Sequence, residues 1–73
     1  MPTIYLRSID NEAGKFFTQF RVKTTESEYE NEVSEESYET RKAAQEAAWE
    51  LAKRYIIDND LFDLNKEFIV VHQ

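Results

Sequence analysis

Residues 40–57 read TRKAAQEAAWELAKRYII, and this stretch is the only part of the chain with strong helical periodicity. At about 100° per residue, small and apolar side chains gather on one side of such a helix: Ala43, Ala44, Ala47, Ala48, Leu51, Ala52 and Tyr55. Thr40 precedes them and is a suitable N-cap. Because alanine lets a helix lie close to its neighbour, the rest of the core must supply large side chains. The pattern predicts one helix, at residues 41–57, packed on a β-sheet.

Four other segments have the composition of strands, and they are expected at residues 3–9, 15–23, 28–36 and 67–72. Gly14 is the only glycine of the chain and is expected to take a positive φ in the first hairpin loop. We therefore predict a single α+β domain, residues 1–73, of order β-β-β-α-β. Three antiparallel strands form a meander, a C-terminal strand joins them, and one helix covers one face of the sheet.

The place of the last strand follows from its composition. Residues 68–71 are Phe, Ile, Val and Val, which is typical of a buried strand. A right-handed crossover through the helix can bring this strand parallel to the first one. We expect it there, because the glutamate-rich third strand is then left at the edge of the sheet, where charge opposes aggregation. In the third strand, Tyr29 and Val33 are expected to point inward.

Composition and charge exclude several classes of protein. The chain has 15 acidic and 9 basic residues, a formal net charge of −6, and no cysteine. The acidic balance argues against direct binding to DNA, which needs clustered lysine and arginine. Without cysteine there is no disulfide and no thiolate metal site. The N-terminal residues do not resemble a signal peptide and no apolar run is long enough to cross a membrane, so we expect a soluble, cytoplasmic protein.

The sequence also offers little support for catalysis. His72 is the only histidine, and it lies beside the last residue, so the serines have no evident general base. Residues 58–69 start like a calcium-binding loop, but Phe62, Asp63 and Ile69 occupy positions that need an oxygen ligand, a glycine and a glutamate. We expect a non-enzymatic protein with no catalytic residue, cofactor or metal.

One acidic run points to a binding function. Residues 26–39 hold seven glutamates and no lysine or arginine. On a strand, alternate residues lie roughly 6.6–6.8 Å apart, which is close to the spacing of phosphates along a nucleic-acid strand. Two interpretations are open: a phosphate mimic that occupies the basic, nucleic-acid-binding surface of a partner protein, or a charged edge that prevents aggregation. The predicted partner-binding residues are Glu28, Glu30, Glu32, Glu36 and Glu39.

A second predicted interface lies on the sheet face that the helix does not cover. Tyr5, Phe17 and Arg21 are expected there, with Trp49 on the flank of the helix as a further candidate. A homodimer or a partner protein would cover these residues. Aromatic and arginine side chains on an open sheet also resemble a platform for single-stranded RNA. Alternatively, Trp49 anchors the loop at residues 61–64.

The helix and the last strand resemble a short bacterial and phage family of unknown function. The resemblance covers roughly the C-terminal half of the chain and rests on Thr40, Ala43, Ala47, Leu51, Ala52 and Lys53, followed by Val70, Val71 and His72. It implies the same fold and carries no activity. In size, acidity and α+β build, the chain is also similar to small phage inhibitors of host defence nucleases, including the anti-CRISPR proteins.

Overall fold

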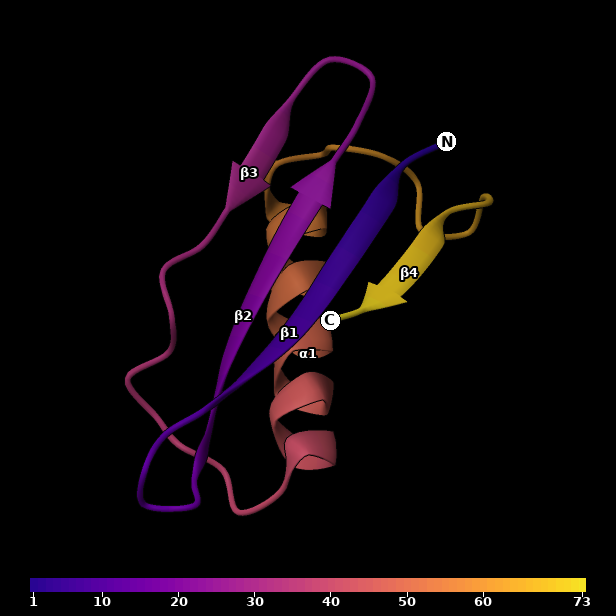
Figure 1. Ribbon diagram of the computed structural model, residues 1–73. Helices are drawn as coiled ribbons and strands as arrows, with labels where there is room; N and C mark the ends of the chain where they lie inside the picture. The colour runs from indigo at the N-terminus through magenta and orange to yellow at the C-terminus, as the bar shows by residue number, and fades with distance from the viewer.

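The structure is a computed structural model that describes residues 1–73. It contains β1 (Thr3–Asp10), β2 (Phe16–Lys23), β3 (Glu28–Glu30), α1 (Arg41–Asp58) and β4 (Ile69–His72). The strands form one mixed sheet of order β3-β2-β1-β4, in which only the β1–β4 pair is parallel (Figure 1). The predicted α+β class, with one helix packed on one face of the sheet, is confirmed.

The ends of α1 and the first hairpin follow local rules. Thr40 is the N-cap, and its hydroxyl oxygen accepts from the amide of Ala43 at 3.1 Å, as predicted. At the other end, the side-chain amide of Asn59 donates to the carbonyl oxygen of Tyr55 at 2.9 Å. Gly14 has the expected positive φ, at 77°, in the loop between β1 and β2. The helix ends and the hairpin loop thus carry residue types that suit their backbone conformations.

The buried stripe of α1 is Ala44, Ala48, Ala52 and Ile56, each of which is fully buried. These residues recur every fourth position and pack against β1 and β2. The helix is therefore rotated relative to the predicted stripe. Leu51, which we expected in the core, is 38% exposed, and Ile56, which we did not include, is at its centre.

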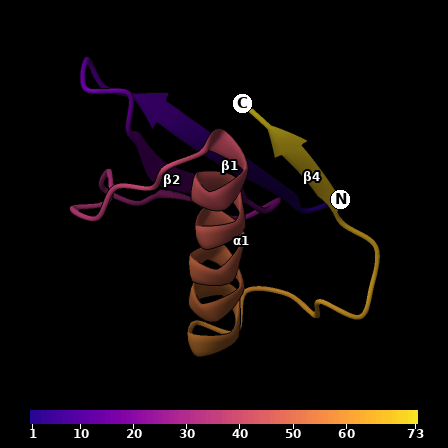
Figure 2. The same ribbon diagram turned by 90° about the horizontal axis from the view of Figure 1, so that it is seen from below.

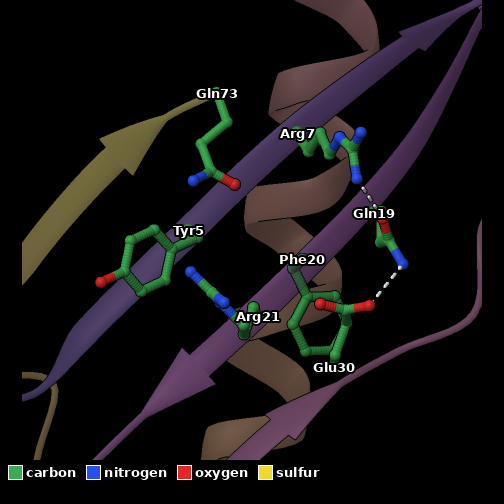
Figure 3. Close-up of a pocket in the computed structure, with 7 residues that line it drawn as sticks. All are labelled: Tyr5, Arg7, Gln19, Phe20, Arg21, Glu30 and Gln73. Carbon is green, nitrogen blue, oxygen red and sulfur yellow. Dashed lines mark hydrogen bonds between the residues drawn. The ribbon is translucent and has the colours of Figure 1, made fainter.

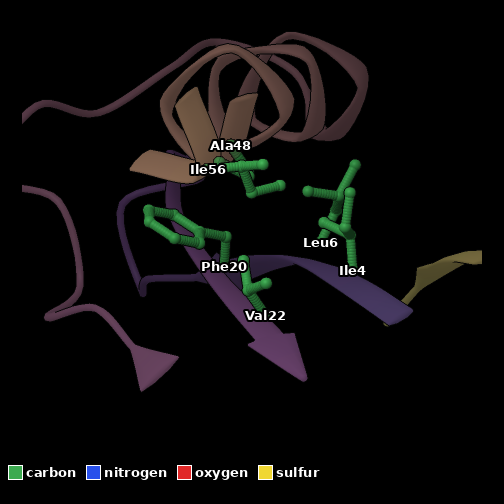
Figure 4. Close-up of a cluster of buried hydrophobic side chains, with 7 residues drawn as sticks. Ile4, Leu6, Phe20, Val22, Ala48 and Ile56 are labelled. Atoms are coloured by element: carbon green, nitrogen blue, oxygen red, sulfur yellow. The ribbon is translucent and has the colours of Figure 1, made fainter. Parts of the chain in front are cut away.

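Apart from Ile56, the large core side chains come from the sheet, as the alanine stripe requires (Figure 4). Ile4 and Leu6 of β1 and Phe20 and Val22 of β2 are at most 5% exposed. Thr18 is also fully buried, and its hydroxyl donates to the carbonyl oxygen of Ala44 at 2.7 Å. A hydrogen bond between a strand side chain and the helix backbone is possible only at close approach. The bond gives the fully buried Thr18 hydroxyl the partner that a polar group without access to water requires.

β4 lies beside β1, with Thr3 opposite Ile69 and Leu6 opposite His72. The prediction that it is buried is wrong: Ile69 is 45% exposed and Val70 is 36% exposed. The reason is the position of the helix: Figure 2 shows that α1 crosses β1 and β2 and leaves β4 to one side. The strand is also shorter than predicted and begins at Ile69 rather than at residue 67.

The predicted length of the third strand differs most from the structure. β3 ends at Glu30, whereas we expected a strand over residues 28–36, and Val33 is 44% exposed instead of pointing inward. The alternation of polar and apolar residues continues past residue 30, but the side chains of Asn31 and Ser34 compete for the hydrogen bonds of β2. The regular ladder therefore stops where these side chains replace it.

The close contact between helix and sheet can be tested by substitution. Ala48→Leu adds bulk where no space is present, and we expect the free energy of unfolding to fall by about 1–3 kcal/mol. Arg54→Leu puts the same side chain on an exposed position of the same helix, where a change within about 0.5 kcal/mol is expected. Urea denaturation followed by circular dichroism measures both. Equal effects would contradict the proposed role of the alanine stripe.

Candidate interaction surfaces

Residues 26–39, which we call the acidic edge, run along the outer side of β2 (Figure 1). After β3, the segment stays attached through paired contacts. The amide of Asn31 donates to the carbonyl oxygen of Phe20 at 3.2 Å, and its side-chain oxygen accepts from the Phe20 amide at 2.7 Å. Ser34 makes the same two contacts with Thr18, at 2.9 and 3.0 Å. The acidic edge is thus fastened to the sheet.

A third pair completes the attachment. The backbones of Phe16 and Tyr38 exchange hydrogen bonds of 2.9 and 2.7 Å. Between Asn31 and Ser34 the acidic edge holds one more residue than β2 does, and between Ser34 and Tyr38 it holds two more. These extra residues bulge outward. The regular spacing of a strand therefore applies to Glu28 and Glu30 alone, and the predicted ladder that continues through Glu32 and Glu36 does not form.

The glutamates of the acidic edge differ in what they contact. Glu28 forms an ion pair with Arg21 at 3.4 Å, and Glu39 forms one with Lys15. Glu30 accepts a hydrogen bond of 3.3 Å from the side-chain amide of Gln19. The remaining four are exposed and have no ion pair: Glu26, Glu32, Glu35 and Glu36. Three of these, Glu32, Glu35 and Glu36, lie on the part of the edge that bulges away from β2, and Glu26 lies in the turn before β3.

The carboxylate of Glu36 contributes to a shift in the pKa of Tyr38. Its pKa is raised above the ordinary value of 10.0, first because the ring is partly removed from water and then because the carboxylate of Glu36 is close. The Tyr38 hydroxyl donates to that carboxylate at 3.4 Å. Both effects favour the neutral phenol.

The open face of the sheet carries two rows of side chains that cross the strands (Figure 3). In the first row, the guanidinium of Arg21 lies 4.1 Å from the centre of the Tyr5 ring and pairs with Glu28 on its other side. In the second row, Arg7 donates to Gln19 at 3.5 Å, and Gln19 donates in turn to Glu30. The two rows line a shallow depression of about 140 Å³. Both arginines of this face therefore already have partners.

The four residues predicted for the second interface do not lie together. Tyr5, Phe17 and Arg21 share the open face, since Tyr5 is opposite Arg21 and Phe17 is opposite Ile9. Trp49 lies on the other side of the sheet, where its ring stacks on Phe68 at 5.9 Å. Trp49 therefore lies on the flank of α1, as expected, and is not part of the open face. Through Phe68 and its neighbour Phe62, the tryptophan anchors the loop that follows α1, which was the alternative interpretation.

His72, the only histidine of the chain, is exposed on the last strand. No group of three or more histidine, cysteine, aspartate or glutamate side chains is arranged to hold a metal ion. The structure contains no helix with both the length and the apolar composition that are needed to cross a lipid bilayer.

We did not predict from the sequence that Asn31 and Ser34 hold the acidic edge. Their signal was present: asparagine and serine interrupt a run of glutamates, and both residue types readily bond to nearby backbone. Gln19 was also missed as the link between Arg7, Glu30 and the Asn31 carbonyl oxygen, to which it donates at 2.9 Å.

No protein family model, characterised protein or solved structure matches the chain. The resemblance to a phage and bacterial family therefore stays a prediction.

The attachment of the acidic edge can be tested through Asn31. Asn31→Ala leaves the Phe20 amide without its acceptor, and we expect the free energy of unfolding to fall by about 1–2 kcal/mol. Hydrogen exchange at the Phe20 amide should become faster. Asn65→Ala, in an exposed loop, is the matched control and should change neither quantity. Unchanged exchange at Phe20 would show that the edge is not held in this way.

The position of Glu36 can be tested by titrating Tyr38. We expect Glu36→Gln to lower the Tyr38 pKa towards 10.0, while Glu35→Gln leaves it unchanged. Because the folded pKa is raised, the stabilisation from this neutral phenol is complete below the unfolded value of 10.0 and is lost as the pH rises through the folded value. NMR of the tyrosine rings follows the titration. An equal effect of both variants would place the carboxylate elsewhere.

Proposed function

We propose that the protein is a non-enzymatic interaction module whose acidic edge binds a basic surface of a partner protein. By occupying that surface it acts as an inhibitor that keeps nucleic acid away, in the manner of a phage antagonist of a host nuclease or defence complex. The observation that carries this proposal is the combination of free charge and fixed backbone in the acidic edge. Four exposed glutamates without an ion pair lie on a segment that three pairs of hydrogen bonds attach to β2.

The attachment of the acidic edge to β2 favours binding, because an ordered segment loses less conformational entropy when it binds. A disordered acidic tail would lose conformational entropy when it binds, whereas the acidic edge is held by Asn31, Ser34 and Tyr38 before any partner arrives. The irregular spacing beyond Glu30 changes the form of the proposal. The edge matches a basic surface through its density of charge and does not reproduce the phosphate spacing of a nucleic-acid strand residue by residue.

The contacts of the open face favour this function over the RNA-binding alternative. Arg21 is paired with Glu28, and Arg7 belongs to a row that ends at Glu30. A phosphate group that approached Arg21 would meet the carboxylate of Glu28, and Arg7 is engaged by the side-chain oxygen of Gln19. The homodimer remains the second candidate, because Tyr5 and Phe17 are only partly buried on a face that nothing covers.

The proposal predicts that binding depends on the free glutamates of the acidic edge. The variant with Glu32→Gln, Glu35→Gln and Glu36→Gln removes three charges and keeps the side-chain size. We expect it to lose most of its affinity for a fluorescein-labelled deca-arginine peptide, measured by anisotropy, while the wild type binds and weakens as salt rises. The wild type should also displace a labelled single-stranded oligonucleotide from the same peptide.

A matched control separates a local effect from a general one. The variant with Glu12→Gln, Asp58→Asn and Glu67→Gln removes the same number of charges at exposed positions that also lack an ion pair. It should bind like the wild type, and circular dichroism should show both variants folded. If the two variants lose affinity equally, only net charge matters and the acidic edge is not the site.

A further inference from the structure

The two outer edges of the sheet are built differently. On the β2 side, the acidic edge covers the strand and carries charge. On the other side, β4 contains only Ile69, Val70, Val71 and His72, and neither a strand nor a helix lies beyond it (Figures 1 and 2). Natural proteins usually protect such an edge with charge, a bulge or a covering segment, because its free backbone groups can pair with another chain.

The backbone of β4 shows which groups are free. The amide of Ile69 donates to the Pro2 carbonyl oxygen at 2.9 Å, and the amide of Gln73 donates to the Leu6 carbonyl oxygen at 2.7 Å. Backbone groups alternate in direction along a strand, so Val70 and His72 turn their N–H and C=O groups towards the outer edge. Two donors and two acceptors thus stand two residues apart, in the arrangement that an added strand requires.

A groove lies beside this edge on the helix side of the sheet. It has a volume of about 210 Å³ and is lined by Leu6, Gln45, Glu46, Trp49, Val70 and His72. Its apolar walls are Leu6, Trp49 and Val70. Glu46 is exposed, has no ion pair, and is the only acidic or basic side chain in the lining apart from His72. The groove therefore suits an apolar side chain that is followed by a positively charged one.

We propose that β4 is a docking edge for an extended peptide segment with apolar side chains at alternate positions and a lysine or arginine on the same side. The segment pairs with the backbone of Val70 and His72. Its apolar side chains enter the groove against Trp49, and its basic group meets Glu46. This surface is separate from the acidic edge, so the proposal does not rest on the proposed function.

Charge complementarity favours this occupant over a second copy of the chain. Each copy has a net charge of −6, and β4 itself supplies no lysine or arginine that could reach Glu46 of another copy. A basic segment gains attraction both from Glu46 and from the overall field. Pairing of two β4 strands would instead bring two acidic molecules together.

The single tryptophan of the chain lines the groove, so its fluorescence reports on binding at this site. The probe is the acetylated and amidated peptide Lys-Thr-Val-Thr-Val-Thr-Lys, which places valine and lysine on one side and threonine on the other. We expect a saturable change in Trp49 emission. Two methylated peptides serve as controls: the first is N-methylated at every threonine and the second at both valines. Only one of these two sets of amides faces β4, so we expect one methylated peptide to bind and the other to fail.

Two variants test the two parts of the site. Val70→Pro removes an N–H that faces outward, at an edge position where proline is tolerated, and should weaken binding roughly fivefold. Glu46→Gln should weaken it roughly twofold to fivefold and reduce its salt dependence. Glu32→Gln makes the same charge change on the acidic edge and should have no effect, which separates this site from the proposed function.

Several outcomes would overturn the proposal. They are an unchanged Trp49 emission at millimolar peptide, equal binding of the two methylated peptides, and equal effects of Glu46→Gln and Glu32→Gln. Sedimentation that shows a dimer of the wild type but a monomer of Val70→Pro would also overturn it, because a second copy would then be the occupant of the edge.

Discussion

The close contact between the alanine stripe of α1 and the central strands decides how the rest of the structure is arranged. Ala44, Ala48 and Ala52 have no side chain beyond Cβ, so the helix lies directly on β1 and β2, near enough for Thr18 to donate to a helix carbonyl oxygen. A helix held so close covers the middle of the sheet and little more. The open face and both outer edges must therefore be stabilised by other means, and these are the surfaces available for function.

Each of these surfaces is treated differently. The charged groups of the open face are paired with one another, since Arg21 and Arg7 lie in rows that end at Glu28 and Glu30. The edge of β2 is fastened to a segment that carries free negative charge. The edge of β4 is left bare, with an apolar groove beside it. This difference underlies both proposals, because the first edge presents charge on an ordered backbone and the second presents unpaired backbone beside an apolar surface.

Much of the fold could be predicted from the sequence, because it rests on local signals. The helix, its cap at Thr40 and the turn at Gly14 each depend on residues that are neighbours in the chain. Errors arose where distant contacts override local pattern. The alternation after Glu30 suggested a longer strand, but Asn31 and Ser34 bond to β2 with their side chains. The apolar residues of β4 suggested burial, but the position of the helix leaves them exposed. Trp49 was expected on the flank of the helix, and it lies there against Phe68.

The difference between the two edges is the central claim, and residue-resolved amide hydrogen exchange of the free wild-type protein tests it most directly. Thr18 and Phe20 donate to the acidic edge, so their amides should be protected to the level of the core. The amides of Val70 and His72 face outward from β4 and should exchange rapidly, while that of Ile69, which donates to Pro2, should exchange more slowly. Rapid exchange at Thr18 and Phe20, or protection at Val70 and His72, would contradict the account.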